Sequence, residues 1–327
     1  MDLVTVHCAH EASGPIKCYS PELMVDPFYS AHELFEERTT TSMMSSTSTS
    51  MVVKEMVQHI TPSLMIQGRI HALVIGPGMG RDDLVMKAVA QIIRVAIQNG
   101  INLVLDADAL YLLTLVPYQG LLEEELALYS SSSSSSSSSK SHVVLTPNVV
   151  EYKRLVDSIG GGSEERLRKK LNGVILIVKG QFDTIEKCSH GDMTTTTTTT
   201  TTTDGTCIST STNQLIKMEC HQVGGMKRSG GIGDILAGMV GSFLAWNQII
   251  ESTRAVKKGD VVVEQEEGEE ATTNLILSCW FACALTKRAT NVAFDKRRRS
   301  MTAPDILEEL GMVMDEYTSS TIMDEIL

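Results

Sequence analysis

The chain has 327 residues, of which 42% are hydrophobic and 21% charged, and its net charge is -12. This length suffices for one large α/β domain or two small ones, and the acidic balance argues against a nucleic-acid partner. No run of about 18 or more apolar residues occurs, so no membrane partner is expected. The N-terminus lacks a signal-peptide pattern, and the seven cysteines are scattered. Both features favour reduced thiols and a cytoplasmic protein.

Strand and helix patterns alternate along the first half of the chain. Residues 1–8 are predicted as a strand, so the chain starts almost inside its sheet. Residues 39–50 are nearly all Thr, Ser and Met and form a low-complexity insert. A βαβ unit follows, made of a strand over 71–75, a helix from Asp82 or Asp83 to about residue 98, and a strand over 101–105. The sheet is therefore expected to be parallel.

Two more low-complexity inserts, a serine run within 130–141 and a threonine run at 194–203, separate the elements of the second half. The threonine run is predicted to interrupt a hairpin between Ile185 and residues 206–208. The segment 256–271 is predicted as a surface loop. The remaining regular elements are strands over 142–145 and 174–178 and helices starting at about 146, 235, 272 and 302.

These elements predict one domain over 1–327 with a three-layer αβα fold. Its central sheet is mostly parallel and carries helices on both faces. In such sheets ligands bind beyond the carboxyl ends of the strands. Polar or glycine-rich motifs follow the predicted strands at 76–80, 106–108, 146–151, 179–183 and 224–234. Their common location predicts one shared site.

The most distinctive motif is a glycine-rich loop over 224–233, which leads into Asp234 and an apolar run with helical spacing. Glycines let backbone N–H groups turn toward an anion, and the helix N-terminus adds partial positive charge. The loop therefore predicts a phosphate cradle. Asp234 is either a helix cap or a base that accepts a proton from a hydroxyl attacking a phosphate.

The other motifs leave alternatives open. The turn at 76–80 departs from a dinucleotide fingerprint, because Arg81 stands where the third glycine belongs. Asp106 and Asp108 are turn formers, or a pair that orients ligands or holds a metal. Glu151 lies three residues after Asn148, where it completes a helix cap or holds a water-coordinated Mg²⁺.

Taken together, the motifs resemble the ATP-dependent NAD(P)H-hydrate dehydratases, a ribokinase-like family. The similarity rests on Gly-Pro-Gly-Met-Gly-Arg at 76–81, Leu-Asp-Ala-Asp-Ala-Leu at 105–110, Thr-Pro-Asn-x-x-Glu-Tyr at 146–152, Val-Lys-Gly-x-x-Asp-x-Ile at 178–185, and the loop at 224–238. It runs from about residue 2 to 315. Compared with that family, the chain is expected to lack an N-terminal strand and helix.

The resemblance implies a repair enzyme, a lyase that returns hydrated NADH or NADPH to NADH or NADPH while ATP, with Mg²⁺, becomes ADP and phosphate. Asp234 is implied as the catalytic base, and Glu151 as a metal contact through water. The implied ATP-binding residues are Lys179, Gly180, Gln181, Phe182, Asp183, Gly224, Gly225, Met226, Lys227, Arg228, Ser229, Gly230, Gly231, Ile232 and Gly233. The implied substrate-binding residues are Gly78, Gly80, Asn148, Val149, Val150, Glu151, Tyr152, Lys153, Arg154 and Asp234.

Two other functions stay open at this point. A ribokinase-like kinase of a small molecule, such as a vitamin precursor, shares the phosphate loop and Asp234. A nucleotide-binding protein without catalysis fits if the N-terminal element is missing. The sequence is also compatible with a homo-oligomer.

Overall fold

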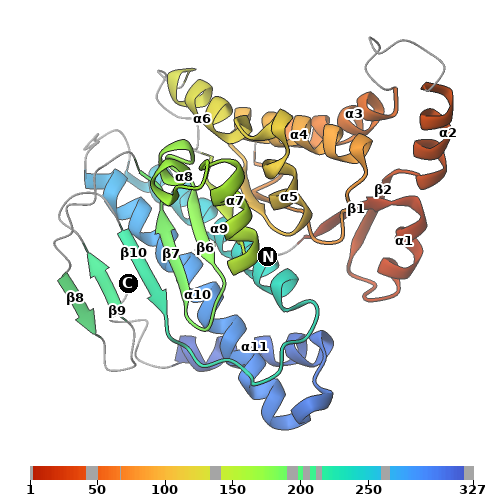
Figure 1. Cartoon of the computed structure of the whole chain (residues 1–327). Coiled ribbons are helices and arrows are strands. Elements are labelled where there is room, and N and C mark those ends of the chain that lie inside the picture. The colour runs from red at the N-terminus through yellow and green to blue at the C-terminus, as the bar shows by residue number, and fades with distance from the viewer. Residues whose placement is uncertain are drawn as a thin grey trace.

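A computed structural model describes residues 3–41, 51–66, 68–132, 141–189, 198–201, 207–210, 216–258 and 266–319 of the chain. Among these residues, eight strands form one sheet with helices on both faces (Figure 1). In spatial order the strands are β3 (Ala72–Ile75), β4 (Asn102–Leu105), β5 (Val143–Leu145), β6 (Ile175–Val178), β7 (Asp183–Lys187), β10 (Ile216–Cys220), β9 (Cys207–Thr210) and β8 (Thr198–Thr201).

The direction of the strands brings most of their carboxyl ends to one edge. Strands β3, β4, β5 and β6 are parallel to one another. Strand β7 is antiparallel to β6 and to β10, so β10 again runs in the direction of β6. The expected mostly parallel αβα architecture is confirmed, with an antiparallel extension through β9 and β8.

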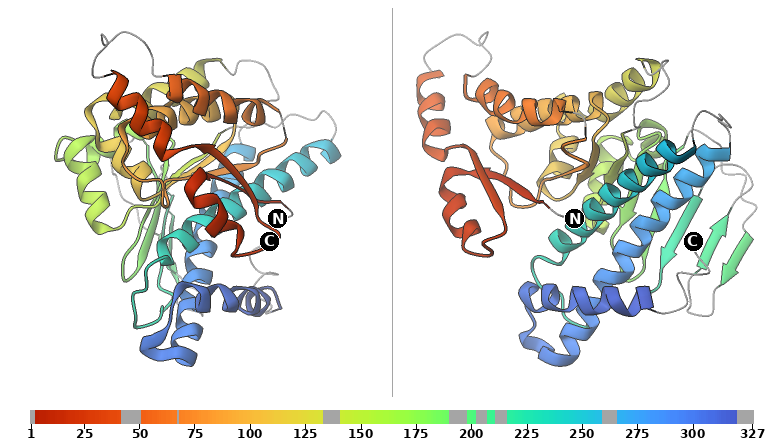
Figure 2. Two further views of the ribbon diagram at one scale, coloured as in Figure 1. Left: turned by 90° about the vertical axis from the view of Figure 1, so that its right-hand side faces the viewer. Right: turned by 180° about the vertical axis from the view of Figure 1, so that it is seen from behind.

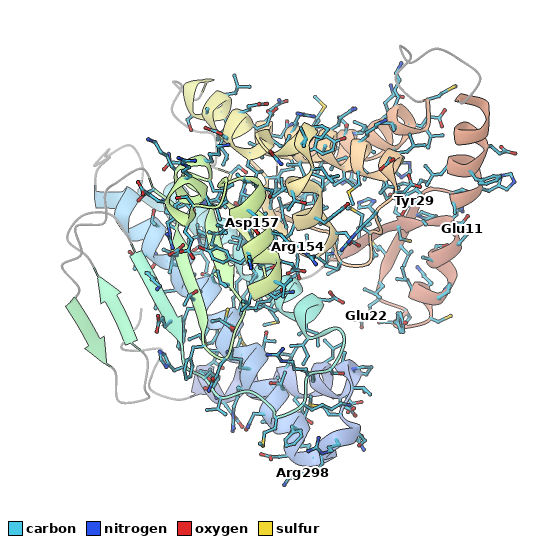
Figure 3. All side chains as sticks on the ribbon, in the orientation of Figure 1. Glu11, Glu22, Tyr29, Arg154, Asp157 and Arg298 are labelled. Carbon is cyan, nitrogen blue, oxygen red and sulfur yellow. The ribbon has the colours of Figure 1, made fainter. Side chains whose placement is uncertain are left out.

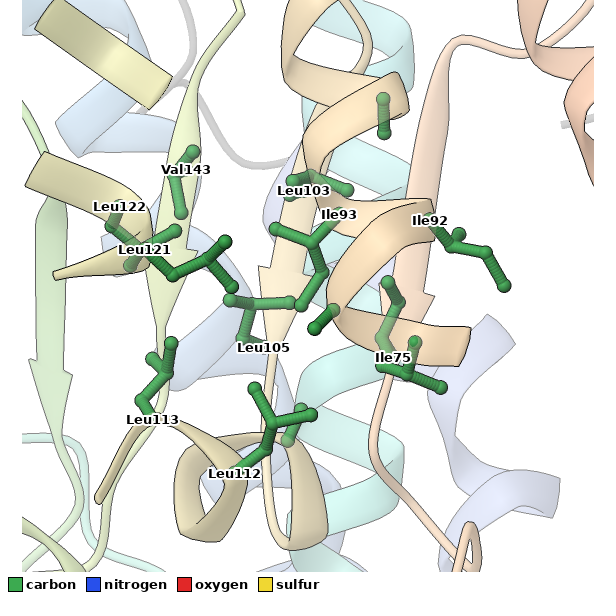
Figure 4. Close-up of a cluster of buried hydrophobic side chains, with 14 of the residues drawn as sticks. Ile75, Ile92, Ile93, Leu103, Leu105, Leu112, Leu113, Leu121, Leu122 and Val143 are labelled. Atoms are coloured by element: carbon green, nitrogen blue, oxygen red, sulfur yellow. The ribbon is translucent and has the colours of Figure 1, made fainter. Parts of the chain in front are cut away.

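Two hydrophobic clusters fill the two sides of the sheet. Leu103 and Leu105 face the first cluster and Val104 the second, as the alternation along a strand requires. Figure 4 shows the first cluster, in which Ile93 of a covering helix packs near Leu105. The helices on this side are α3 (Met51–Met65), α4 (Asp83–Gln98), α5 (Asp108–Thr114), α6 (Leu121–Ser132), α7 (Val149–Ser158) and α8 (Glu164–Lys170).

The second side is covered by the C-terminal helices. These are α9 (Ile232–Lys258), α10 (Glu266–Arg297) and α11 (Ala303–Ser319). Helix α9 packs on β3 and β4 so closely that a Cβ atom on Gly241 would lie 2.6 Å from Val74 Cγ2. Two 3-10 turns, η1 (Val116–Tyr118) and η2 (Arg298–Ser300), also belong to this main body. Within the described part of the chain, no helix is long and apolar enough to cross a membrane.

The N-terminal segment corrects one prediction. Strand β1 (Thr5–Ala9) is not part of the main sheet but pairs in parallel with β2 (Met24–Tyr29) in a small sheet of its own. Helices α1 (His10–Lys17) and α2 (Ala31–Thr41) accompany it, and Figure 2 shows this unit beside the main body. Only Cys8 of β1 is buried, so the strand has too little apolar surface for a central position.

The predicted hairpin partner of Ile185 is also wrong. Ile185 pairs with Met218 on β10, and Cys207 and Ile208 on β9 lie one strand further out. Part of the threonine run is itself strand β8, because its β-branched side chains suit an edge strand. Other predicted loops are shorter in the structure, since the serine run begins inside α6 and α10 begins at Glu266. Residues 42–50, 133–140, 194–197 and 202–203 of the inserts lie outside the described residues.

Candidate active site

Five loops lie at the edge of the main sheet where β3, β4, β5, β6 and β10 end. They contain the five motifs that the sequence singled out. Contacts between them are direct: Asn148 and Lys179 form an isolated parallel bridge, and Asp108 reaches the turn after β3. The structure therefore assembles one site from motifs far apart in the chain, and the roles of the individual residues remain predictions.

The glycine-rich loop over 224–233 is anchored to the helices beside it. The backbone N–H of Gly225 donates to Thr290 Oγ1 at 3.0 Å, and a Cβ atom at this position would lie 2.4 Å from the carbonyl oxygen of Thr290. Lys227 Nζ donates to the carbonyl oxygen of Met301. Close packing therefore explains the glycine at 225, and Lys227 holds the loop instead of pointing freely at an anion.

Asp234 lies in the first turn of α9, two residues after the helix begins at Ile232. Ile235 N–H already donates to Gly231 O at 2.9 Å, and Gly231 has the left-handed φ of +90° that a tight entry needs. Asp234 is therefore past the capping position, which disfavours the reading as a simple cap. Its side chain is exposed, beside the partial positive charge of the helix N-terminus.

A buried ion pair lies directly beneath this turn. Lys179 Nζ is 2.8 Å from Asp106 Oδ1, and the Asp106 side chain is only 2% exposed. A Cβ atom on Gly233 would lie 3.4 Å from Lys179 Nζ. The ammonium group thus lies next to the glycine-rich loop over 224–233. A positive charge at this place suits the binding of phosphate oxygens.

The turn after β3 is held by a second carboxylate. Gly80 N–H donates to Asp108 Oδ2 at 3.0 Å, and Arg81 Nε lies 2.9 Å from Asp108 Oδ1. The guanidinium of Arg81 stacks over the ring of Tyr111 at 4.2 Å. Gly78 and Gly80 have positive φ angles, and a Cβ atom on either would meet nothing within 4 Å. These contacts hold the turn in place, and its two glycines face open space that a ligand can enter.

The segment from Asn148 to Arg154 starts α7 with a complete capping box. Asn148 Oδ1 accepts from the N–H groups of Val150 and Glu151, and Glu151 Oε2 accepts from Asn148 N–H at 2.8 Å. Glu151 therefore completes the helix cap, which is one of the two roles that the sequence allows for it. Burial raises the pKa of Tyr152. The exposed residues of this segment are Asn148, Val149, Val150, Lys153 and Arg154, and Figure 3 labels Arg154.

The buried side chain of Asp183 holds the loop after β6 in place. Gly180 N–H donates to Asp183 Oδ1 at 2.9 Å, and Asp183 is 4% exposed. Burial raises the pKa of Asp183, and the ammonium of Lys287 on α10 opposes that rise. Asp183 therefore faces its own loop. Phe182 is 46% exposed, and its ring stacks on His221 with 4.3 Å between the ring centroids.

No group of three or more His, Cys, Asp or Glu side chains that could hold a metal occurs in the described residues. A Mg²⁺ ion usually reaches such proteins on nucleotide phosphates, with one or two protein carboxylates and several waters. The site fits an ion carried in this way, because Asp234 is exposed at the end of the glycine-rich loop and Glu151 uses only its Oε2 atom for the cap.

Fold and site together define an αβα protein in which an exposed acidic residue follows a glycine-rich loop at the N-terminus of a helix. The family model described as NAD(P)H-hydrate dehydratase matches residues 1–311. The chain belongs to this family.

Curated relatives agree with this assignment. The chain is 31% identical to the ATP-dependent (S)-NAD(P)H-hydrate dehydratase of Saccharomyces cerevisiae, over 95% of this chain and 80% of that protein. It is 30% identical to the rat protein of the same name, over 95% of this chain and 69% of the rat protein. A crystal structure of the ADP/ATP-dependent NAD(P)H-hydrate dehydratase of Bacillus subtilis is similar with a TM-score of 0.50. It is 14% identical, covering 96% of this chain and 81% of that one, and supports the fold.

Several residues of the site escaped the sequence-based assignment. Lys287 and Thr290 come from α10, more than 60 residues from the loops that they hold. His221 joins the site only because β10 ends beside the loop of Phe182. Asp106 was noticed as half of a pair, but its partner Lys179 lies 73 residues away. Strand-end position was the available signal for Asp106 and His221, whereas no local pattern marked Lys287 and Thr290 inside α10.

Proposed function

We propose that the protein is an ATP-dependent NAD(P)H-hydrate dehydratase, a lyase that restores NADH or NADPH from the hydrated forms. The observation that carries this proposal is the position of Asp234. Its exposed carboxylate follows the glycine-rich loop at the N-terminus of α9, where Lys179 stands beside Gly233. Membership of the family, and curated relatives named for this reaction, identify the substrate class.

The ATP requirement follows from the leaving group. Hydroxide leaves carbon poorly near neutral pH, whereas phosphate leaves readily. In the proposed first step the ring hydroxyl oxygen attacks the γ-phosphorus of ATP, ADP departs, and the hydroxyl proton passes to the Asp234 carboxylate. In the second step the C–O bond breaks, and phosphate leaves together with a proton from the neighbouring ring carbon. The sum is NAD(P)H, ADP, phosphate and one proton, which Asp234 then releases to water.

The two sides of the site suit the two substrates. On one side, the loop over 224–233 and the segment over 179–183 hold ATP, with Mg²⁺ on its phosphates. There the backbone N–H groups of the α9 N-terminus and Lys179 face the phosphates. On the other side, the turn at 78–80 and the segment over 148–154 contact the hydrated nucleotide. Asp234 directly follows the loop over 224–233, and we assign it the role of the base that acts between the two substrates.

We also propose that the protein works in the cytoplasm. Six cysteines of the described residues are free thiols, and two of them, Cys279 and Cys283, are fully buried. Burial raises the pKa of Cys279 to about 12, so this thiol stays protonated and inert. Such cysteines are typical of proteins from reducing compartments.

Product analysis tests the proposed reaction against the kinase alternative. The protein is incubated with hydrated NADH, Mg²⁺ and ATP, and ADP, inorganic phosphate and NADH are quantified after separation. We expect the three products in equal amounts. Formation of ADP with a stable phosphorylated compound and no inorganic phosphate would instead establish a kinase, and binding of ATP without ADP formation would establish a non-catalytic protein.

A further inference from the structure

Three neighbouring strands of the main sheet end in polar residues on the same face. Because side chains alternate, Val104, Val144 and Ile177 face the α9 side of the sheet. Each is followed two positions later by a polar residue at the strand end, and these residues are Asp106, Thr146 and Lys179. A polar layer thus lies under the N-terminus of α9, between the hydrophobic core and the phosphate loop.

We propose that Asp106 is a positioning residue, which holds the ammonium group of Lys179 against the first turn of α9 so that it stabilises the charge of the transferred phosphoryl group. This inference rests on the proposed function, because it assigns a task within the phosphoryl-transfer step. Asp106 acts through Lys179, and nothing in the geometry requires it to touch ATP. The ion pair of 2.8 Å and the 2% exposure of the Asp106 side chain carry the proposal.

The geometry around Gly233 places the Lys179–Asp106 ion pair beside the glycine-rich loop over 224–233. A Cβ atom on Gly233 would lie 3.4 Å from Lys179 Nζ and 3.7 Å from Asp106 Oδ2. Both charged groups therefore lie close to Gly233, one residue before Asp234. Lysine carries its charge on a flexible four-carbon stem, so a fixed partner is needed to keep the ammonium in one place. A buried carboxylate supplies that partner.

The backbone around Asp106 has an uncommon conformation and is closely packed. The next residue, Ala107, has φ 47° and ψ -112°, a conformation that residues with a Cβ atom rarely adopt. This kink sends the neighbouring carboxylates of Asp106 and Asp108 to different partners, Lys179 and the Gly80 turn. On the other side, a Cβ atom on Gly76 would lie 1.8 Å from the carbonyl oxygen of Asp106. Strain of this kind is retained where it orients functional groups.

Thr146 is a second, independent observation in the same layer. It lies at the end of β5, between the strands that carry Asp106 and Lys179, and is fully buried. Its hydroxyl finds no hydrogen-bond partner among the residues that the structure describes. Buried hydroxyl groups in folded proteins are nearly always paired. Packing alone does not explain an unpaired hydroxyl group in this layer. Its presence supports a layer that borders a phosphate-binding site.

The test compares the ground state with a mimic of the transferred phosphoryl group. Calorimetry measures the affinity of the intact protein for Mg²⁺–ADP, with and without aluminium fluoride. In Asp106→Asn, which keeps the shape but removes the charge, we expect affinity for the fluoride complex to fall at least 10-fold and affinity for ADP less than 3-fold. With hydrated NADH, kcat should fall by a similar factor while the KM for ATP changes little. Asp157→Asn on α7, an exposed charge-matched control labelled in Figure 3, should change neither affinity.

Equal losses for both complexes, or no loss, would overturn the proposal, and so would a wild-type protein that gains nothing from aluminium fluoride. If Asp106→Asn fails to fold, Lys179→Met should show the same selective loss. A wild-type protein that makes no NADH would refute the proposed function. The comparison of ADP with its fluoride complex would still decide whether Asp106 and Lys179 act on phosphoryl charge.

Discussion

The ammonium group of Lys287 lies 3.3 Å from Asp183 Oδ1, and these two residues hold the loop after β6 against α10. Lys287 Nζ also donates to the carbonyl oxygen of Gln181 at 2.7 Å. Both side chains are largely buried: 14% of the Lys287 side chain and 5% of the Asp183 side chain are exposed. A helix from the far end of the chain thus sets the position of the segment that we assign to ATP.

Replacing Lys287 by Met should destabilise the protein strongly. The substitution leaves the Asp183 carboxylate buried without its partner, which typically costs about 3–5 kcal/mol. Chemical denaturation measures the change. The double variant with Asp183→Asn should recover part of the loss, because no uncompensated charge remains. A single variant as stable as the wild type would show that the pair contributes little.

Gly225→Ala should lower the melting temperature. The added methyl group would lie 2.4 Å from the carbonyl oxygen of Thr290 and 2.8 Å from Phe294 Cβ, and overpacking of this kind costs roughly 1–3 kcal/mol. Gly230→Ala is the matched control in the same loop, because its methyl group would meet nothing within 4 Å. Thermal unfolding should separate the two, and similar melting temperatures would contradict the packing described for Gly225.

Stability should fall as the pH is lowered below 6.5, in part because of His7. Burial lowers the pKa of His7 from its ordinary value of 6.5, although Asp26 opposes this shift. The unfolded chain therefore takes up a proton below pH 6.5 before the folded chain does, and stability present above that pH is lost. The groups that face His7 are Asp26, at 3.0 Å, and His59, which binds the same carboxylate. In His7→Gln, melting temperatures between pH 7.5 and 5.5 should decline less steeply, and an unchanged slope would exclude this role.

Deleting residues 133–139 should leave the melting temperature nearly unchanged. This serine segment lies outside the described residues and connects α6 to β5. Serine offers little apolar surface for a core, and the entropy of closing a loop depends only weakly on its length. Differential scanning calorimetry is a direct check. A drop of many degrees would mean that the segment contributes to the fold.

The sequence predicted which residues leave the sheet at its carboxyl edge, because that information is local. Glycine after Ile75 and Asp106 after Leu105 mark strand ends whatever the strands pair with. Alternation also predicts the face on which each side chain lies. The parallel core and the shared edge could therefore be predicted before any contact was known.

Pairing between distant segments was not predictable in the same way. Strand β1 has the local pattern of a strand, but nothing local states that β2 is its neighbour and the main sheet is not. The partner of Ile185 likewise depends on whether β10 or β9 competes better for the edge of β7, a matter of side-chain packing. For the same reason Lys227 was predicted to bind ATP, whereas its side chain binds the carbonyl oxygen of Met301. Lys287, which binds the carbonyl oxygen of Gln181, was not singled out at all.

The most direct test of the account is the recovery of NADH by Asp234→Asn and by the wild type. Both proteins are given hydrated NADH, Mg²⁺ and ATP, and the near-ultraviolet absorbance of NADH is followed. We expect recovery by the wild type only when ATP is present. A rate at least about 10²-fold lower is expected for Asp234→Asn, the usual contribution of a general base, with ATP binding retained. Equal recovery by the two proteins, or loss of ATP binding together with activity, would contradict the role assigned to Asp234.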